Sequence, residues 1–432
     1  MYLKGSKWSM NRRRQHFNWF RIILICLFIA AGLYLDKYVI PTQPSPFEPT
    51  ATATRPPEAY VTEAEGLFRQ GKLLQSIQAY QQAVAVEPDD PTVYVALARV
   101  QVFAGEYQGA QTSAENALLL NPNNSMAHAV RAWALDFESN YLEAEASIKR
   151  ALELDSKNAV AHAYYVEILV DEYTSGTGGF DNVQKAIDES KTAQALAPDS
   201  LETHRARGYV LEATANYEEA VREYQAAIAI NDKISDLHLA LGRNYSALGI
   251  YDQAVQEYTN ANALNPSDPT PDYLISRTYA TVGEFAKAMQ YAETAVKDDP
   301  GSPRYHGNLG VMYYHNALIS DAVRELALAV AGGTTEDGQK VEPIELAPNS
   351  PRIAEIYFTY ALALAKVGRC GETLQIAQIV QARIPDDALS VDNVNEAIRA
   401  CQQNLASSGT SLSGFGLTAT PSLEAIGVTP TP

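Results

Sequence analysis

A period of 34 residues runs through most of this 432-residue chain and restricts its fold more than any other feature. Pro88 and Pro122 are 34 positions apart, and so are Pro266 and Pro300. Twice that interval, 68 positions, separates Pro198 from Pro266. Each proline follows the end of an expected helix, which its missing N–H cannot continue, and all but Pro198 come directly after an acidic residue or Asn. A fixed period of this length predicts a stack of similar supersecondary units.

Within one period, the residue pattern predicts two helices joined by a short turn. In residues 237–266, Leu241 and Tyr245 are four positions apart and fall on one face of a first helix. Gly249 follows that helix, where a residue with positive φ can close it. A small residue recurs at one position of the second helix: Ala110, Ala144, Ala186, Ala220, Ala254, Ala288 and Ala322. We expect two helices to cross closely there.

These residues resemble the tetratricopeptide repeat, in which Leu-Gly, Tyr, Ala, an aromatic residue and Pro recur at set offsets. The resemblance covers residues 58 to about 385 as nine units, and a helix near residues 388–403 follows. It implies an all-α fold, a right-handed superhelical α-solenoid of about nine helix-turn-helix repeats with a C-terminal capping helix. Extra residues interrupt the period around 173–180 and 334–350. We expect both inserts to be loops that project from the solenoid edge and add binding surface.

The N-terminal segment predicts export across a membrane. Residues 1–21 contain six Lys and Arg and no acidic residue, and the 14 residues that follow carry no charge. We expect a basic cytoplasmic tail at residues 1–21 and a transmembrane signal-anchor helix at residues 22–40. A cleavable signal peptide is the alternative, because Ala30, Ala31 and Gly32 suit a cleavage site. Cleavage would release a secreted protein.

Both alternatives place the remainder of the chain outside the cytoplasm, with the basic end inside. Residues 41–57 are rich in Pro and Thr, which predicts an extended stalk. Residues 404–432 have a similar composition, which predicts a disordered tail. The repeat array then occupies residues 58–403.

Composition and motifs exclude several classes of function. The chain has 33 Lys and Arg against 51 Asp and Glu, a net charge of −18, whereas nucleic-acid binding needs clustered cations. Three Cys are too few for a disulfide framework or for paired C-x-x-C zinc motifs. The sequence lacks HExxH, GxSxG, P-loop and GxGxxG motifs. We expect no enzyme activity, no cofactor and no metal site.

Five of the seven histidines occupy one position, four residues into the first helix of a unit. They are His128, His162, His204, His238 and His306. Such a column would suit a metal ladder or a pH sensor. Packed helices lie about 8–10 Å apart, too far for neighbouring units to share an ion at ligand distances of about 2.0–2.1 Å. Tyr60, Tyr94 and Tyr357 take the same position in other units. We therefore interpret the column as packing residues and keep a pH sensor as the alternative.

Two cysteines flank the end of the array. Cys370 opens the second helix of unit nine, and Cys401 ends the helix that follows. Antiparallel neighbours would bring these two ends together, where the thiols of an exported protein can oxidise to a disulfide. Two separate buried thiols are the alternative.

A second stripe of the first helices, roughly opposite the packed face, predicts a binding surface. In tetratricopeptide proteins this stripe lines a concave groove that binds extended peptides or partner helices. Its residues here are Arg99, Trp133, Arg205, Tyr209, Arg243, Tyr273, Arg277, Arg304, Asn308 and Tyr314. Arginines suit carboxylates, and aromatic faces suit apolar or Pro-rich segments. In the alternative, the arginines pair with acids of the same stripe: Glu65, Glu167, Glu202, Glu212 and Asp236.

These features lead to one functional hypothesis and one main alternative. We expect a membrane-anchored, extracytoplasmic scaffold or adaptor that binds protein or peptide segments in its groove and assembles a cell-envelope complex. The adaptor role comes from the resemblance. The alternative is a non-catalytic subunit that presents substrate to a separate envelope enzyme, a glycosyltransferase or a protease. The expected partners are proteins or peptides, together with the lipid bilayer at residues 22–40.

Overall fold

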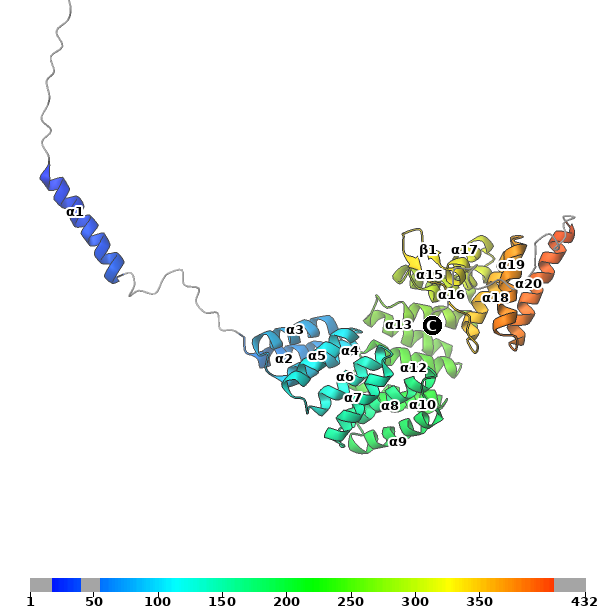
Figure 1. Cartoon of the computed structure of the whole chain (residues 1–432), viewed down its shortest axis with the longest axis horizontal. Coiled ribbons are helices and arrows are strands. Elements are labelled where there is room, and N and C mark those ends of the chain that lie inside the picture. Colours follow the sequence, from blue (N-terminus) through cyan, green and yellow to red (C-terminus); the bar gives the residue numbers. More distant parts are fainter. Residues whose placement is uncertain (1–17, 40–54, 408–432) are drawn as a thin grey trace, which may run out of the picture. The chain divides into compact units, whose positions relative to one another are not determined.

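The structure is a computed structural model that describes residues 18–39 and 55–407 (Figure 1). It divides into two units, one before Pro57 and one from Pro57 onward. Most of the predicted basic tail (residues 1–17), the last residue of the predicted transmembrane helix (40), most of the stalk (41–54) and most of the C-terminal tail (408–432) lie outside the described residues.

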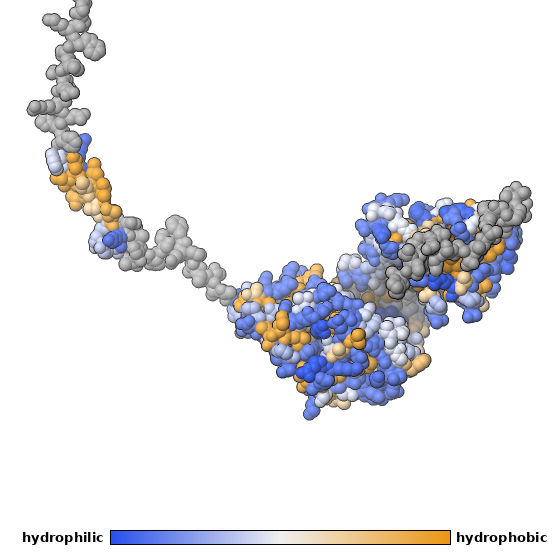
Figure 2. Space-filling model, viewed as in Figure 1, coloured by the Kyte–Doolittle hydropathy of each residue, from blue (hydrophilic) through white to orange (hydrophobic). Residues whose placement is uncertain are grey.

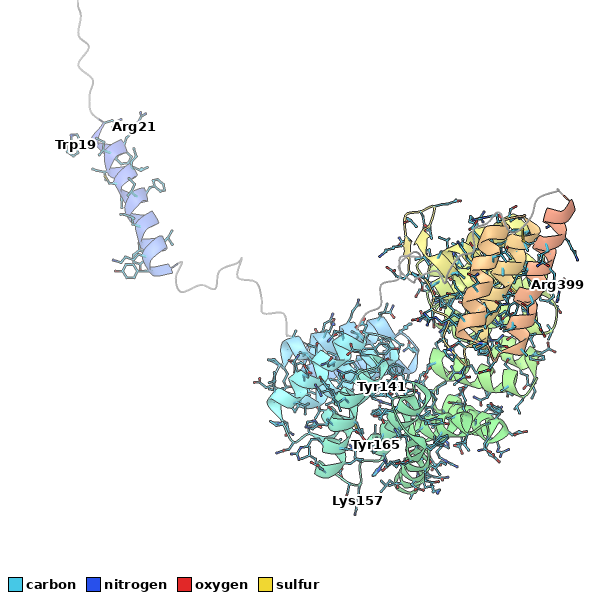
Figure 3. All side chains as sticks on the ribbon, turned by 45° about the vertical axis from the view of Figure 1, so that its right-hand side comes forward. Trp19, Arg21, Tyr141, Lys157, Tyr165 and Arg399 are labelled. Carbon is cyan, nitrogen blue, oxygen red and sulfur yellow. A yellow bond between two sulfur atoms is a disulfide. The ribbon has the colours of Figure 1, made fainter. Side chains whose placement is uncertain are left out.

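The first unit contains helix α1 (Trp19–Tyr34) and a π-helical turn, η1 (Leu35–Val39). None of the α1 side chains is buried, and Figure 2 shows that its surface is mostly hydrophobic. Trp19 and Arg21 project from its first turn (Figure 3).

The transmembrane helix that we predicted at residues 22–40 is not supported by the structure. Helix α1 has 16 residues, and the π-helical turn that follows it contains Asp36 and Lys37. Across residues 18–39 and 55–407, no helix combines the length and the apolar character that a membrane crossing requires.

The second unit is an α-solenoid, which confirms the predicted fold class. Within residues 57–407, nine helix pairs follow one another and a single helix, α20 (Ala388–Ser407), closes the array. The first helices of the pairs are α2 (Pro57–Arg69), α4 (Pro91–Phe103), α6 (Ser125–Phe137), α8 (Ala159–Thr174), α10 (Leu201–Ala213), α12 (Ser235–Ala247), α14 (Thr270–Thr281), α16 (Pro303–His315) and α18 (Pro351–Lys366). The second helices are α3 (Leu73–Val86), α5 (Tyr107–Leu120), α7 (Tyr141–Leu154), α9 (Phe180–Leu196), α11 (Tyr217–Ile230), α13 (Tyr251–Leu264), α15 (Phe285–Asp298), α17 (Ile319–Ala331) and α19 (Cys370–Arg383).

Short polar side chains set where several first helices begin. The Asp90 carboxylate accepts a hydrogen bond from the Thr92 N–H at 2.8 Å, and the Asn158 side chain accepts one from the Ala161 N–H at 3.1 Å. These side chains satisfy N–H groups that the helix itself leaves without partners. At the other end, Gly249 closes α12 with φ +73°. The sequence pattern therefore defines each unit locally.

Close contact between the two helices of a unit depends on small residues. The seven alanines of the second-helix column are fully buried: Ala110, Ala144, Ala186, Ala220, Ala254, Ala288 and Ala322. In the first helix, Gly242 faces the Tyr258 ring, and a Cβ added there would lie 2.5 Å from Tyr258 Cε1. A larger residue at Gly242 would therefore push α12 and α13 apart.

Only parts of the two inserts are the projecting loops that we expected, namely residues 175–179 and the mostly exposed hairpin residues 333–340. The first insert lengthens two helices, because α8 has 16 residues and α9 has 17, whereas α6 and α7 have 13 and 14. The second insert contains an antiparallel hairpin of β1 (Gly333–Thr334) and β2 (Lys340–Val341). It packs against the array, since Val341 and Leu346 are buried and the Tyr357 hydroxyl donates to the Ile344 carbonyl at 2.8 Å. Apolar side chains within the insert explain why it folds back.

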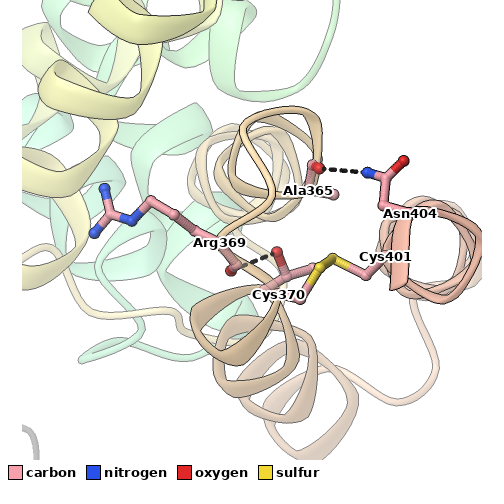
Figure 4. Close-up of a disulfide and its surroundings, with 6 residues drawn as sticks. Ala365, Arg369, Cys370, Cys401 and Asn404 are labelled. Carbon is pink, nitrogen blue, oxygen red and sulfur yellow. Dashed lines mark hydrogen bonds between the residues drawn. A yellow bond between two sulfur atoms is a disulfide. The ribbon is translucent and has the colours of Figure 1, made fainter. Parts of the chain in front are cut away.

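The end of the array is closed by helix α20 and by a disulfide between Cys370 and Cys401 (Figure 4). The two Cα atoms are 5.5 Å apart, and both side chains are buried. The Asn404 side chain also donates to the Ala365 carbonyl at the end of α18, at 3.2 Å. Because α20 continues to Ser407, the capping helix extends four residues into the segment that we predicted as a disordered tail.

Candidate functional site

Trp133 on α6 and Arg205 on α10 form the centre of a buried cluster on the predicted stripe. Trp133 stacks on Tyr164 with ring centroids 4.3 Å apart, and its Nε1 donates to Glu167 at 2.8 Å. The Arg205 guanidinium lies 4.9 Å from the Trp133 ring and pairs with Glu167 at 3.3 Å and Asp236 at 2.9 Å. Burial raises the pKa of Glu167 to about 7, although the nearby Arg205 charge opposes that shift. Glu167 and Arg205 are therefore paired within the cluster, whereas the Tyr164 hydroxyl and Glu167 Oε1 are buried without a hydrogen-bond partner.

Tyr209 belongs to the same interior, next to a pair of buried acids. Its hydroxyl donates to Asp171. Burial is the largest cause that raises the pKa of both Asp136 and Asp171, and the carboxylate of Asp171 raises the pKa of Asp136 further. Two neighbouring buried carboxyl groups repel each other when both are ionised. A proton shared between Asp136 and Asp171 removes one of the two charges and so lowers the cost of burying the pair.

Arg99 and Arg243 also have partners within the protein. Arg99 on α4 pairs with Glu202 on α10, across 103 positions of sequence. The Arg243 Nε donates to Glu212 at 2.9 Å. Arg99, Arg205 and Arg243 therefore pair with acidic residues of the same stripe, as in the alternative to a ligand-binding groove that the sequence analysis left open.

The first repeat of the array (α2 and α3) also contacts the fifth and sixth repeats. Phe68 on α2 packs against Phe103 with ring centroids 5.5 Å apart and against the apolar cluster that contains Leu237. A Cβ added at Gly71 would lie 2.7 Å from the Cβ of Lys233. Side chains of the array itself therefore occupy part of the inner face between α2 and α12.

Four other predicted residues meet at a pocket in the C-terminal part of the array. Tyr273 and Arg277 come from α14, and Arg304 and Asn308 come from α16. The pocket has a volume of about 260 Å³. Its remaining lining residues come from α16, the second insert and α18: Val311, Ile344, Ser350, Pro351, Arg352, Ile353 and Ile356. Sequence reasoning missed these residues apart from the general expectation that the insert adds binding surface.

The polar groups of this pocket are only partly paired. Arg277 Nη1 donates to Glu355 at 2.9 Å, and Arg352 reaches the same carboxylate at 3.9 Å. Arg304 is exposed, and it has no ion pair or hydrogen bond to any residue that the structure describes. Asn308 donates through Nδ2, but its Oδ1 is buried without a hydrogen-bond partner, as is Arg277 Nε. Two of the three arginines therefore share one carboxylate, Arg304 has none, and two buried polar atoms lack a hydrogen-bond partner.

Tyr314, the last residue of the predicted set, is separate from the pocket. The Lys366 ammonium lies 4.3 Å from the centre of its ring, and His315 packs edge-on against it at 5.9 Å. Tyr314 therefore contributes to packing between α16 and α18.

The histidine column forms a repeated ion pair that the sequence analysis did not foresee. In four units, Nδ1 of the histidine faces a glutamate of the second helix of the same unit. The pairs are His162–Glu189, His204–Glu223 at 2.7 Å, His238–Glu257 at 2.6 Å and His306–Glu325 at 2.6 Å. The glutamate follows 19 positions after the histidine, or 27 in the unit with the first insert, a spacing that could have revealed the pairs.

In His162, His238 and His306, the second ring nitrogen also has a partner, and this contact favours the charged form. His238 Nε2 lies 3.1 Å from the Asp232 carbonyl, and His306 Nε2 lies 2.9 Å from the Pro300 carbonyl. A carboxylate and a carbonyl can only accept, so an imidazolium satisfies both nitrogens. Burial lowers the pKa of His238 and of His306, but the glutamate and carbonyl hydrogen bonds outweigh it and the net pKa is raised. His128 has only a carbonyl partner, and burial lowers its pKa.

Comparison with known proteins finds similarity to a repeat family in two parts of the array. The family profile described as tetratricopeptide repeat matches residues 67–134 and 245–311. No curated protein matches the chain.

Several solved structures resemble the chain at low identity. One is PilF of Pseudomonas aeruginosa, with 19% identity over 47% of this chain and 89% of that one and a TM-score of 0.39. Another is a tetratricopeptide repeat protein from Parabacteroides merdae, with 14% identity over 59% and 98% and a TM-score of 0.39. A third is PilW, a widely conserved type IV pilus biogenesis factor, with 21% identity over 47% and 90% and a TM-score of 0.42.

Proposed function

We propose that this chain, which carries tetratricopeptide repeats, is a non-catalytic scaffold that binds a segment of a partner protein between α14, α16 and α18. The observation that carries the proposal is the pocket lined by Tyr273, Arg277, Arg304 and Asn308. It is concave, and it combines an aliphatic wall with a few polar groups, as binding sites do.

The N-terminal part of the stripe has a structural role in this proposal. Its arginines, Arg99, Arg205 and Arg243, are held by Glu202, Glu167 and Glu212. A ligand carboxylate would have to displace these partners and leave buried acids unpaired, which is costly. Binding is therefore directed to the C-terminal part, where Arg304 is exposed.

We place this scaffold outside the cytoplasm. The disulfide between Cys370 and Cys401 supports that location, since disulfides persist in oxidising compartments. The basic stretch before the apolar residues 22–35 supports export with the N-terminus inside. Attachment to a membrane through residues 22–40 stays a prediction, and release after cleavage is its alternative. Protease accessibility of the array in intact cells, compared with lysed cells, tests the location.

Two roles follow from partner binding in the envelope. In the first, the array brings structural proteins together into a complex. In the second, it presents substrate to a separate glycosyltransferase or protease. The identity of the protein that occupies the pocket separates these roles.

Site-specific photo-crosslinking in the native cells tests the proposal. A photoreactive residue replaces Arg352, which lies at the pocket and has an exposed side chain, or Arg222, which is exposed on α11 away from the pocket. We expect a discrete protein adduct from position 352 that Arg304→Glu abolishes, and no such adduct from position 222. Equal adducts from both positions, or an adduct that Arg304→Glu leaves unchanged, would refute binding at the pocket.

A further inference from the structure

We propose that the pocket between α14, α16 and α18 recognises an Asp or Glu side chain beside an aliphatic side chain in the partner segment. This inference rests on the proposed function, because it names the chemistry of the segment bound there. Charge, unpartnered buried atoms and the apolar wall carry it independently of one another.

The pocket is a local excess of positive charge in an acidic protein. Arg277, Arg304 and Arg352 line it, and Glu355 is the one carboxylate that the structure pairs with any of them. The whole chain has a net charge of −18, so an acidic partner is repelled by most of the surface. Arg304 is exposed, and its guanidinium can bind a carboxylate through two parallel N–H···O hydrogen bonds, a bidentate pair. Charge complementarity therefore favours an acidic group at this position.

Two residues that line the pocket each carry a buried atom without a partner, and a peptide can supply a partner for both. Arg277 Nε can only donate, and Asn308 Oδ1 can only accept; both are buried without partners. Asn308 is 3% exposed, and its Nδ2 is already used by the Ser276 hydroxyl at 2.9 Å. A carboxylate can accept from Arg277 Nε, and a backbone N–H can donate to Asn308 Oδ1. A peptide segment with an acidic residue supplies both groups, whereas an inorganic anion has no N–H.

The apolar wall selects the neighbouring side chain. Val311 and Ile356 are buried, and Ile344 and Ile353 are half-buried at the edge of the pocket. A volume of about 260 Å³ has room for one aliphatic side chain next to the carboxylate. Ile344 belongs to the second insert, which Tyr357 holds through its hydrogen bond to the Ile344 carbonyl. The insert therefore completes the apolar wall, which the regular repeats alone would leave open.

Two blocked dipeptides of nearly identical shape separate charge from size. The probes are acetyl-Leu-Asp-amide and acetyl-Leu-Asn-amide, added to the full-length chain with its isoleucine methyl groups labelled for NMR. We expect the Asp peptide to shift the methyl signals of Ile344, Ile353 and Ile356, and to bind at least fivefold more tightly than the Asn peptide. Arg304→Gln should remove this preference, and the exposed control Arg222→Gln should retain it.

Several results would overturn the inference. They are equal binding of the two dipeptides, no shift at the three methyl groups, or a preference that Arg304→Gln does not change. A shift of the same signals after deletion of residues 408–432 would mean that the end of the chain occupies the pocket, which also excludes a separate partner. The photo-crosslink reports on partner binding alone. An adduct without Asp preference leaves the proposed function intact, whereas Asp preference without an adduct refutes partner binding in cells.

Discussion

Removing the disulfide between Cys370 and Cys401 should loosen the C-terminal end of the array and leave the remaining units intact. The two cysteines are 31 positions apart in sequence. In the chain-entropy model, closing a loop of that length removes roughly 12 cal/mol/K from the unfolded state, or about 3.7 kcal/mol at 25 °C. The effect should be local, because each repeat contacts mainly its neighbours.

Helix α20 is the element that depends most on this link. It docks through Val394, Ala397 and Cys401, which are fully buried on one stripe. Amide hydrogen exchange measures its opening directly. In the double variant Cys370→Ala and Cys401→Ala, we expect the protection of α20 amides to fall by up to about 400-fold, since every 1.4 kcal/mol corresponds to a factor of ten. The amides of α6 should keep their protection.

Cys26→Ser provides the control, because Cys26 is an exposed free cysteine and its replacement leaves the disulfide in place. Unchanged protection of α20 in the double variant would refute the reasoning. So would an equal loss at α6 and α20, because it would show that the array opens as one cooperative unit.

Three further predictions concern stability. The pKa of His306 is raised above 6.5 in the folded state, so the stability from its ion pair is complete below about pH 6.5 and is lost as pH rises through the folded pKa. The free energies of unfolding of the wild type and of His306→Gln, measured in urea across pH 5–9, should therefore differ at low pH and agree at high pH. Gly242→Ala should lower the free energy of unfolding, measured in urea, by about 1–3 kcal/mol, because the added Cβ would clash with the packed Tyr258 ring. Arg205→Ala should lower the free energy of unfolding by about 3–5 kcal/mol, because it leaves Glu167 buried without its ion-pair partner. Arg304→Ala should lower it by less than about 0.5 kcal/mol, because Arg304 is exposed. Equal losses would contradict the conclusion that Arg205 is structural and Arg304 is free to bind a ligand.

Residues close in sequence determined most of the fold. The 34-residue period, the alanine column and the turn glycines act within one unit or between adjacent units, so the α-solenoid was predictable. Even so, the turn conformation does not require glycine everywhere, because Ser139 and Ala215 adopt positive φ at the equivalent turns. The histidine column was visible in the sequence, but its glutamate partners lie on another helix.

The binding stripe shows where sequence alone was insufficient. The sequence placed Arg99, Arg205 and Arg304 on one helical face, since side-chain direction follows from helical periodicity. It could not distinguish them, because the pairing of Arg99 with Glu202 spans 103 positions and depends on how successive units curve. The packing of the second insert likewise depends on contacts with α17 and α18. Helical periodicity sets which residues share a face, whereas the accumulated rotation between units decides which of those residues meet a partner and which remain open to a ligand.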